Sequence, residues 1–285
     1  VWSPDGKQIA FVREYEPEPG GKGMDDLFVV DAQAGAAARK VTSFQSAGGQ
    51  RMVWSPDGRS LAYFVGMEPK FSAYNQSHLE LVSAAGGASR DLTGKLDRIV
   101  SLPEFTPDGS AVTFLVEDDR RVYLQRMPLA GDGAVQKLTD GSYVLAETHT
   151  AGGNTALLAS NDSAAPEVFA FENGKLRKLT GQNDAFLSEV QLGAVEDFSA
   201  KTKDGSEVHG LMTKPPFYDP AKKYPVLLWI HGGPGMQDDH ALPFNLYPLQ
   251  FERQMFATHG YVVLAVNYRG STGRGEDYSK AIFAD

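Results

Sequence analysis

The stretch Pro225-Val226-Leu227-Leu228-Trp229-Ile230-His231-Gly232-Gly233-Pro234-Gly235 carries the strongest structural signal in this 285-residue chain. Its first six residues form an unbroken apolar run, which is typical of a strand that is buried on both faces. The run ends at once in His231-Gly232-Gly233, and two consecutive glycines predict a sharp backbone turn that no side chain obstructs. The stretch therefore predicts a buried strand that leads into an open glycine loop.

A second apolar run, Tyr261–Val266, follows a segment whose apolar residues have helical spacing. That segment begins near Pro248 and stops at Gly260, a residue type that commonly ends helices. The right-handed crossover rule predicts that the two apolar strands flanking this helix are parallel. Upstream, residues 198–212 are typical of a β-hairpin with an Asp204-Gly205 turn. The C-terminal third of the chain therefore predicts the beginning of an α/β domain.

The first two thirds of the chain contain a repeat. The motif aromatic-Ser/Thr-Pro-Asp-Gly occurs at Trp2–Gly6, Trp54–Gly58 and Phe105–Gly109, at spacings of 52 and 51 residues. In each copy Pro sets the first turn position, Asp accepts hydrogen bonds from the turn amides, and Gly supplies a positive φ. Alternating apolar residues follow each turn, and one small sheet cannot bury such faces alone. We therefore expect the units to stack, with the three aromatic residues packed between sheets.

A fourth, degenerate unit runs through residues 155–180, with Gly152-Gly153-Asn154 in place of Pro-Asp-Gly. The repeat predicts a partial β-propeller of about four blades over residues 1–192, followed by an α/β domain over residues 193–285. A β-sandwich with chance turns is the alternative, and the even spacing favours the propeller. Because the chain opens inside a motif, we expect further blades on the N-terminal side.

Composition excludes several classes of function. The net charge of −9 and the pI of about 5.2 argue against a nucleic-acid partner, which requires clustered Lys and Arg. No apolar run reaches the length of about 20 residues that a membrane helix needs. Cysteine is absent, so there is no thiolate nucleophile and no Cys-based zinc site. Localisation stays open between the cytoplasm and the periplasm or exterior, because we expect the natural N-terminus to lie upstream.

The order of these motifs resembles the prolyl oligopeptidase superfamily of serine peptidases. In that family Trp-Ser-Pro-Asp-Gly blades lead into His-Gly-Gly-Pro and then into Asn-Tyr-Arg-Gly-Ser, which stand here at residues 231–234 and 267–271. The resemblance covers essentially the whole chain. It implies a β-propeller followed by the N-terminal part of an α/β-hydrolase domain, and His-Gly-Gly-Pro points toward the acylaminoacyl-peptidase-like branch.

The resemblance also implies roles for residues in the glycine loop. Gly233 would offer its backbone N–H to an oxyanion, and His231 would shape the loop or line the pocket. Gly232, Pro234 and Arg269 would lie near the substrate, although Arg269 is expected first to anchor a loop. Without the resemblance, the same stretch is a tight turn that carries no chemistry. No cofactor and no metal ion are implied.

The nucleophile of that family is not found in this sequence. It requires Gly-x-Ser-x-Gly followed by Asp and His, and no serine here has glycine both two residues before and two residues after it. Ser271 is flanked by Arg269 and Gly273, so it is not expected to be the nucleophile. We expect the triad to lie beyond Asp285, and this chain alone to be inactive.

Other polar residues have simpler interpretations. Asp238-Asp239-His240 contains metal-ligand types, but three consecutive residues cannot all face one ion, so a solvated loop is expected. His149, His209 and His259 have no partner at ligand spacing and are expected at the surface or in turns.

The resemblance therefore implies a serine peptidase that cleaves short peptides through an acyl-enzyme. Removal of dipeptides, removal of acylated residues and internal cleavage all remain open, as does a homo-oligomer. A binding or scaffold protein that has lost its nucleophile, or an esterase, are the alternatives.

Overall fold

The computed structural model describes residues 1–15, 24–45, 52–66, 70–71, 74–131, 133–233, 235–242 and 251–283. They divide into two compact units, one of residues 1–116 and 124–137 and the other of residues 117–123 and 138–285. The change of sequence pattern at residues 192/193 does not coincide with this division, because residues 138–192 group with those that follow them. The domain assignment based on that pattern stays a prediction.

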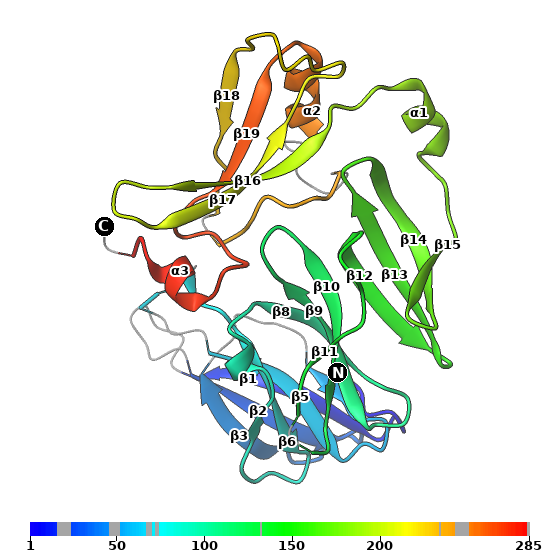
Figure 1. Ribbon diagram of the computed structural model, residues 1–285. Helices are drawn as coiled ribbons and strands as arrows, with labels where there is room; N and C mark the ends of the chain where they lie inside the picture. Colours follow the sequence, from blue (N-terminus) through cyan, green and yellow to red (C-terminus); the bar gives the residue numbers. More distant parts are fainter. Residues whose placement is uncertain are drawn as a thin grey trace. The chain divides into compact units, whose positions relative to one another are not determined.

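Four antiparallel sheets follow one another along the chain (Figure 1). The first contains β1 (Gln8–Tyr15), β2 (Met24–Asp31) and β3 (Arg39–Gln45). The second contains β4 (Val53–Trp54), β5 (Ser60–Val65), β6 (His78–Ser83) and β7 (Arg90–Asp91). After a 3-10 turn at Gly94–Leu96, the third contains β8 (Val100–Phe105), β9 (Ala111–Glu117), β10 (Val122–Pro128) and β11 (Gln136–Lys137). The fourth contains β12 (Val144–Ala151), β13 (Asn154–Asn161), β14 (Ala164–Glu172) and β15 (Lys175–Lys178).

The three Pro-Asp-Gly segments adopt one and the same turn. In each, the Ser or Thr hydroxyl donates to the Asp carboxylate, over 2.7, 2.6 and 2.6 Å in chain order. The glycine φ values are 69°, 69° and 67°, so each glycine occupies the left-handed region that the turn requires. The Thr106 hydroxyl and the Ser110 amide lower the pKa of Asp108 to about 2. The repeat seen in the sequence is therefore a structural repeat.

Strand β5 shows how the sheets of the first unit pack. Its alternate residues Leu61, Tyr63 and Val65 join a buried cluster with side chains of β1–β3. Phe64 points to the opposite face and joins a second cluster with β8–β10. Because side chains alternate across a strand, the two faces of this one strand pack against two different sheets. Stacking of small sheets is confirmed, and no closed ring of sheets is present among the described residues.

One aromatic residue of the repeat departs from the prediction. Trp54 is buried and its indole N–H donates to the carbonyl oxygen of Val1 over 3.3 Å, but Trp2 is 62% exposed. Trp2 makes only an isolated bridge with Ile9 at the edge of the first sheet. The expectation that Trp2 packs between two sheets is wrong, because no described sheet covers that edge.

The C-terminal residues form a mixed sheet in the order β16-β17-β19-β18. Its strands are β16 (Val195–Lys201), β17 (Glu207–Thr213), β18 (Val226–Trp229) and β19 (Val262–Asn267). The helices nearby are α1 (Asp184–Glu189), α2 (Phe251–Thr258) and α3 (Glu276–Lys280). β18 and β19 are parallel, as the crossover rule predicted, and β16 and β17 form the predicted hairpin. The predicted helix start near Pro248 lies outside the described residues.

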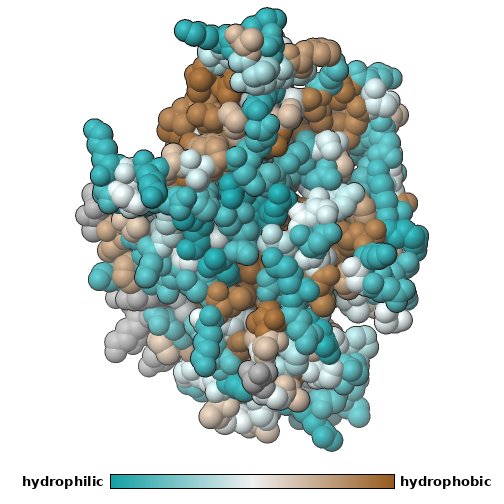
Figure 2. Space-filling model, in the orientation of Figure 1, coloured by the Kyte–Doolittle hydropathy of each residue, from teal (hydrophilic) through white to brown (hydrophobic). Residues whose placement is uncertain are grey.

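Strand β18 differs from its prediction in burial. Val226 and Leu228 are 61% and 58% exposed, so the strand is not buried on both faces. It is the edge strand of the sheet, and no described element covers the face on which these two residues lie. Figure 2 shows the resulting hydrophobic surface over β18 and near α2. Contiguous apolar surface of this kind marks a face that another element or another molecule covers.

None of the helices in the described part of the chain combines the length and the apolar character needed to cross a bilayer.

Candidate functional site

The loop that follows β18, residues 231–242, is called the glycine loop below. Gly233 lies at the exposed end of this loop. Its φ is 128°, a backbone conformation that residues with a Cβ atom rarely adopt. A Cβ atom added there would lie 3.0 Å from the Gly235 nitrogen and 3.0 Å from Met236 Cγ. Within the described residues, no acceptor is bonded to the Gly233 N–H. Gly232 is also exposed, and Pro234 lies outside the described residues.

His231, the first residue of the glycine loop, is held in place by buried contacts of its side chain. Its Nδ1 lies 2.8 Å from the carbonyl oxygen of Gly232, and its Nε2 lies 2.8 Å from Ser271 Oγ. The carbonyl oxygen can only accept, so Nδ1 carries a proton and donates to it, while Nε2 shares a hydrogen bond with the serine hydroxyl. The ring stacks on Tyr268 at a centroid distance of 4.7 Å, and the Tyr268 hydroxyl donates to the His231 carbonyl over 2.8 Å. His231 therefore joins the loop to the segment after β19.

The contact between His231 and Ser271 has the geometry of a nucleophile and its base, but its surroundings exclude that role. Ser271 has no exposed surface, so a substrate carbonyl cannot reach its oxygen. The other ring nitrogen of His231 faces a backbone carbonyl, whereas a catalytic imidazolium is stabilised by a carboxylate at that position. Ser271 therefore has a structural role. This agrees with the sequence, in which Ser271 lacks the glycine two residues before it that the nucleophile motif requires.

The middle of the glycine loop is bound to the same segment. The Thr272 N–H donates to the carbonyl of Met236 over 3.1 Å. The Asp238 N–H donates to Asn267 Oδ1 over 2.7 Å, and Asn267 Nδ2 returns a bond to the Asp238 carbonyl over 2.9 Å. Asn267, at the end of β19, is itself buried. The order His-Gly-Gly followed by Asn-Tyr-Arg-Gly-Ser thus has a structural reason, because the second segment holds the first.

Asp238 and Asp239 are not in a solvated loop, and that expectation is wrong. Asp238 is 1% exposed, and its Oδ1 pairs with Nη1 of the buried Arg253, on α2, over 3.4 Å. Burial raises the pKa of Asp238, and the charges of Arg253 and His231 oppose this rise. Burial also raises the pKa of Asp239 to about 6. The loop carries these acids inward because α2 supplies a cation beneath it.

The raised pKa of Asp239 leads to a prediction for stability. The pKa of this acid rises from about 3.9 to about 6 on folding. Its ionised form therefore destabilises the folded state fully above about pH 6, and the effect is absent below about pH 3.9, where the acid is protonated in both states. Asp239→Asn keeps the oxygen that accepts from the Ala241 N–H and removes the charge. We expect a gain of about 1–2 kcal/mol in the free energy of unfolding at pH 7 and no gain near pH 4. Urea titrations at both pH values measure it, and an equal gain at both would contradict the assignment.

His240 lies at the far end of the glycine loop and is 4% exposed. Its ring contacts Asp162, in the β13–β14 turn, and Asp197, on β16. Backbone bonds reinforce this attachment: the His240 N–H donates to the Arg120 carbonyl over 3.1 Å, and the Leu242 N–H donates to the Asn161 carbonyl over 2.9 Å. The end of the loop is therefore held by three different segments.

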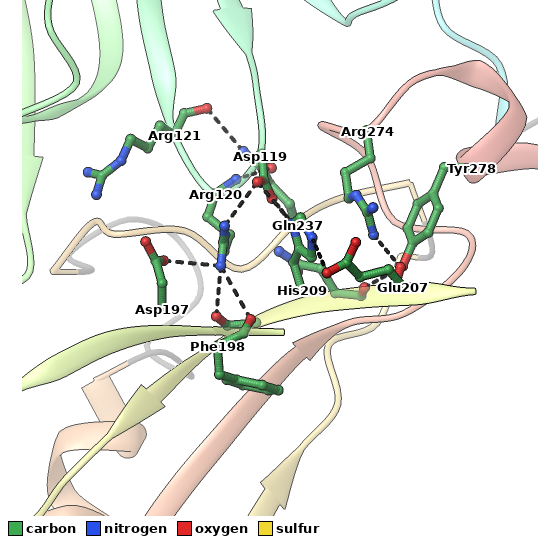
Figure 3. Close-up of polar contacts among 12 residues, drawn as sticks. Asp119, Arg120, Arg121, Asp197, Phe198, Glu207, His209, Gln237, Arg274 and Tyr278 are labelled. Carbon is green, nitrogen blue, oxygen red and sulfur yellow. Dashed lines mark hydrogen bonds and ion pairs between the residues drawn. The ribbon is translucent and has the colours of Figure 1, made fainter. Parts of the chain in front are cut away.

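Arg120 lies in the tip of the β9–β10 hairpin, between two carboxylates (Figure 3). Its Nη2 lies 2.9 Å from Asp119 Oδ2, and its Nη1 lies 3.1 Å from Asp197 Oδ1. Nη1 also donates to the carbonyl of Gly210 over 3.2 Å. Asp119 and Arg120 both have positive φ values, 43° and 69°, which residues other than glycine adopt only where their surroundings impose them. Their contacts explain why this tip is ordered.

The same tip holds two further residues (Figure 3). Gln237 of the glycine loop accepts from the Arg120 N–H over 2.9 Å and donates to the Arg121 carbonyl over 3.2 Å. His209 Nδ1 lies 2.9 Å from Asp119, and its side chain is 20% exposed, so His209 is partly buried and has a carboxylate partner that the sequence did not predict. Burial alone would raise the pKa of Asp119, but the bond from His209 and the charge of Arg120 lower it. The β9–β10 tip and the glycine loop belong to one polar network.

Arg269 forms an ion pair with another residue of this chain. Its Nη1 lies 2.7 Å from Asp204 Oδ2, in the turn between β16 and β17. The pair is partly exposed, and it anchors the segment after β19 to the hairpin. A role of Arg269 in holding a substrate stays a prediction. Among the described residues, no group of three or more His, Asp or Glu side chains is arranged to bind a metal ion.

Sequence reasoning missed the network of Asp119, Arg120, Asp162, Asp197 and His240. Its members come from four segments that are far apart in the chain, and no local pattern in any of them indicates that they meet. The one available signal is the run Asp118-Asp119-Arg120-Arg121, a concentration of charge between two apolar strands.

Comparisons with known proteins show what this chain is similar to. Residues 247–285 match the family model described as the prolyl oligopeptidase family. Dipeptidyl-peptidase 5 of Porphyromonas gingivalis is 24% identical over 295 residues, and the match covers 100% of this chain and 41% of that protein. Dipeptidyl-peptidase 5 of Aspergillus fumigatus is 28% identical over 298 residues, covering 98% of this chain and 40% of that protein. The chain thus spans about two fifths of the length of these relatives.

The fold also matches solved structures. Acylaminoacyl peptidase of Pyrococcus horikoshii aligns with a TM-score of 0.77 at 20% sequence identity, over 99% of this chain and 41% of that chain. At this identity the likeness concerns the fold alone. The family match, the relatives and the fold point the same way, and the chain is similar to proteins of the prolyl oligopeptidase superfamily.

Proposed function

We propose that the parent protein is a serine peptidase that hydrolyses short peptides through an acyl-enzyme, and that these residues supply its oxyanion loop. The repeated sheets would be blades of a propeller that limits access to the site by size. The mixed sheet would be the beginning of an α/β-hydrolase domain, and the nucleophile, acid and base would lie elsewhere in the parent protein.

One observation carries this proposal: a glycine with a φ of 128° at the exposed end of the loop after β18, held from beneath by buried polar contacts. An oxyanion hole needs donors that are fixed before the reaction, so that no reorganisation is required when charge develops. The Gly233 N–H meets this requirement, because His231 and Asp238 anchor the loop on either side of it. Exposure of Gly233 leaves the amide open to a substrate.

The proposed substrate class follows from the relatives. Proteins named dipeptidyl-peptidase 5 and acylaminoacyl peptidase release short fragments or blocked residues, as their names state, and both match nearly all of this chain. We infer a peptide substrate with a short or blocked N-terminal end. Acyl transfer to serine would create the tetrahedral oxyanion that Gly233 binds.

The parent protein and the 285-residue chain should differ in reaction with a fluorophosphonate probe. We expect the parent to be labelled at one serine in a Gly-x-Ser-x-Gly motif and to hydrolyse dipeptidyl or acylaminoacyl p-nitroanilides. The 285-residue chain, which has no such serine, should neither be labelled nor hydrolyse them.

Two outcomes would contradict the proposal. Labelling of Ser271 would mean that the nucleophile lies within this chain. A folded parent protein that the probe does not label would favour the binding or scaffold protein, and hydrolysis of simple esters without peptides would favour the esterase.

A further inference from the structure

His240 has a carboxylate on each side of its ring. Nδ1 lies 2.7 Å from Asp162 Oδ2, and Nε2 lies 2.8 Å from Asp197 Oδ1. An ionised carboxylate can only accept hydrogen bonds, so each ring nitrogen must donate one. Only the imidazolium carries two N–H groups, because the neutral ring would direct a lone pair at one of the two acids. The geometry therefore requires a doubly protonated ring.

The charges that face His240 come from four segments. The acids are Asp162 in the β13–β14 turn, Asp197 on β16 and the neighbouring Asp239, and the cations are Arg120 and Arg121 in the β9–β10 tip. Burial alone would lower the pKa of His240, but the bonds and charges of Asp162 and Asp197 outweigh burial and raise it. Arg121 opposes this rise, while Arg120 is neutralised in part by its own contact with Asp197.

The ring of His240 holds the end of the glycine loop that is remote from Gly233. Asp197 Oδ1 accepts from both His240 and Arg120, so one carboxylate connects the loop to the β9–β10 tip. Gln237, between Gly233 and His240, bonds that same tip. If the imidazolium were lost, one of its two bonds would be replaced by repulsion between a lone pair and a carboxylate. The far end of the loop would then keep only its backbone bonds to Arg120 and Asn161, while the His231, Gln237 and Asn267 contacts would still hold the rest of the loop.

We propose that the His240 imidazolium is a positioning residue of the glycine loop, which it fixes to β16 and the β13–β14 turn so that the Gly233 N–H stays in place. The catalytic consequence rests on the proposed peptidase function, whereas the charge and the anchoring do not. A group whose pKa is raised on folding stabilises the folded state fully below its unfolded pKa of about 6.5. That contribution is lost as the pH rises through the folded pKa, so the loop should loosen on the alkaline side.

The charge of the ring can be measured without any activity. In parent protein labelled with ¹⁵N-histidine, we expect the two ring nitrogens of His240 to keep imidazolium shifts well above a pH of about 6.5, the ordinary pKa of histidine. His240→Gln identifies the resonance. A neutral His240 ring at pH 6.5 would overturn the proposal.

The anchoring is tested by hydrogen exchange at the Leu242 N–H, which donates to Asn161. In His240→Gln we expect this amide to exchange at least about 10-fold faster at pH 7, because its local opening becomes easier. His259→Gln is the matched control and should leave the exchange rate unchanged. Unchanged protection in a folded His240→Gln protein would show that the ring does not hold the loop.

Activity provides a third test. In the parent enzyme, His240→Gln should lower kcat by about 10-fold to 10²-fold with little change in KM, because a misplaced donor acts on the transition state. The alkaline limb of the wild-type kcat profile should disappear in this variant and persist in His259→Gln. An alkaline limb that persists at the same pH in His240→Gln would overturn the positioning role. A parent protein without peptidase activity would contradict the proposed function alone, and the exchange and NMR results would still decide the proposal about His240.

Discussion

Removal of the Gly233 N–H from the parent enzyme should lower kcat by about 10²–10³-fold, or roughly 2.7–4 kcal/mol in transition-state stabilisation. An amide donor in an oxyanion hole binds the developing charge more strongly than it binds the ground-state carbonyl. Its loss therefore appears in kcat much more than in KM. Steady-state kinetics with a dipeptidyl or acylaminoacyl p-nitroanilide measure both constants.

The structure decides how this donor should be removed. Gly233→Pro deletes the N–H, but proline fixes φ near −65°, whereas Gly233 has a φ of 128°. The proline variant would therefore lose the loop shape together with the donor. Glycolic acid at position 233 replaces the N–H by an ester oxygen and leaves the backbone free to adopt the same φ.

A matched variant separates the donor from the loop shape. Gly233→Ala keeps the N–H but places a Cβ 3.0 Å from Met236 Cγ, so it reports on distortion alone. We expect the ester to lose more kcat than the Ala variant, with thermal melts showing that both are folded. A folded ester variant with near-normal kcat would show that Gly233 is not the donor, and Gly232 would be tested next.

Local patterns in the sequence predicted the elements well. Pro-Asp-Gly turns, the β16–β17 hairpin and the parallel pair β18–β19 all follow from residues that lie close together in the chain. Turn chemistry depends on three or four adjacent residues, so a single sequence is enough to identify it. The glycine loop was predicted for the same reason, because two adjacent residues, Gly232 and Gly233, are enough to indicate a sharp turn.

Burial was predicted less well. An apolar run cannot tell a central strand from an edge strand, and β18 is an edge strand among the described residues. The acids Asp238 and Asp239 look solvated in sequence, because the cation that accompanies them, Arg253, lies 15 and 14 residues away on α2. Residues that meet only after folding leave no local pattern. The network around His240 is the clearest example, since it joins four separate segments.

Arg253→Met should be strongly destabilising, at about 3–5 kcal/mol near pH 7. Arg253 is 5% exposed and pairs with Asp238, which is 1% exposed. Met fills much of the same volume, so the main effect is an uncompensated buried carboxylate. Asp238 Oδ2 already has no hydrogen-bond partner among the described residues, so little is left to stabilise the charge. Chemical denaturation of the variant and the wild type measures the difference.

The pH dependence of this loss distinguishes charge from packing. Burial raises the pKa of Asp238, and loss of the Arg253 charge would raise it further. Below that pKa the acid is protonated and no charge is buried, so the deficit of Arg253→Met should shrink as the pH falls from 7 toward 5. Arg177→Met is the control: its pair with Glu172 is exposed, 60% and 51% on the two side chains, and exposed ion pairs contribute little to stability. A loss in Arg253→Met that is the same at both pH values would mean that packing of the guanidinium, rather than its charge, holds α2 beneath the glycine loop.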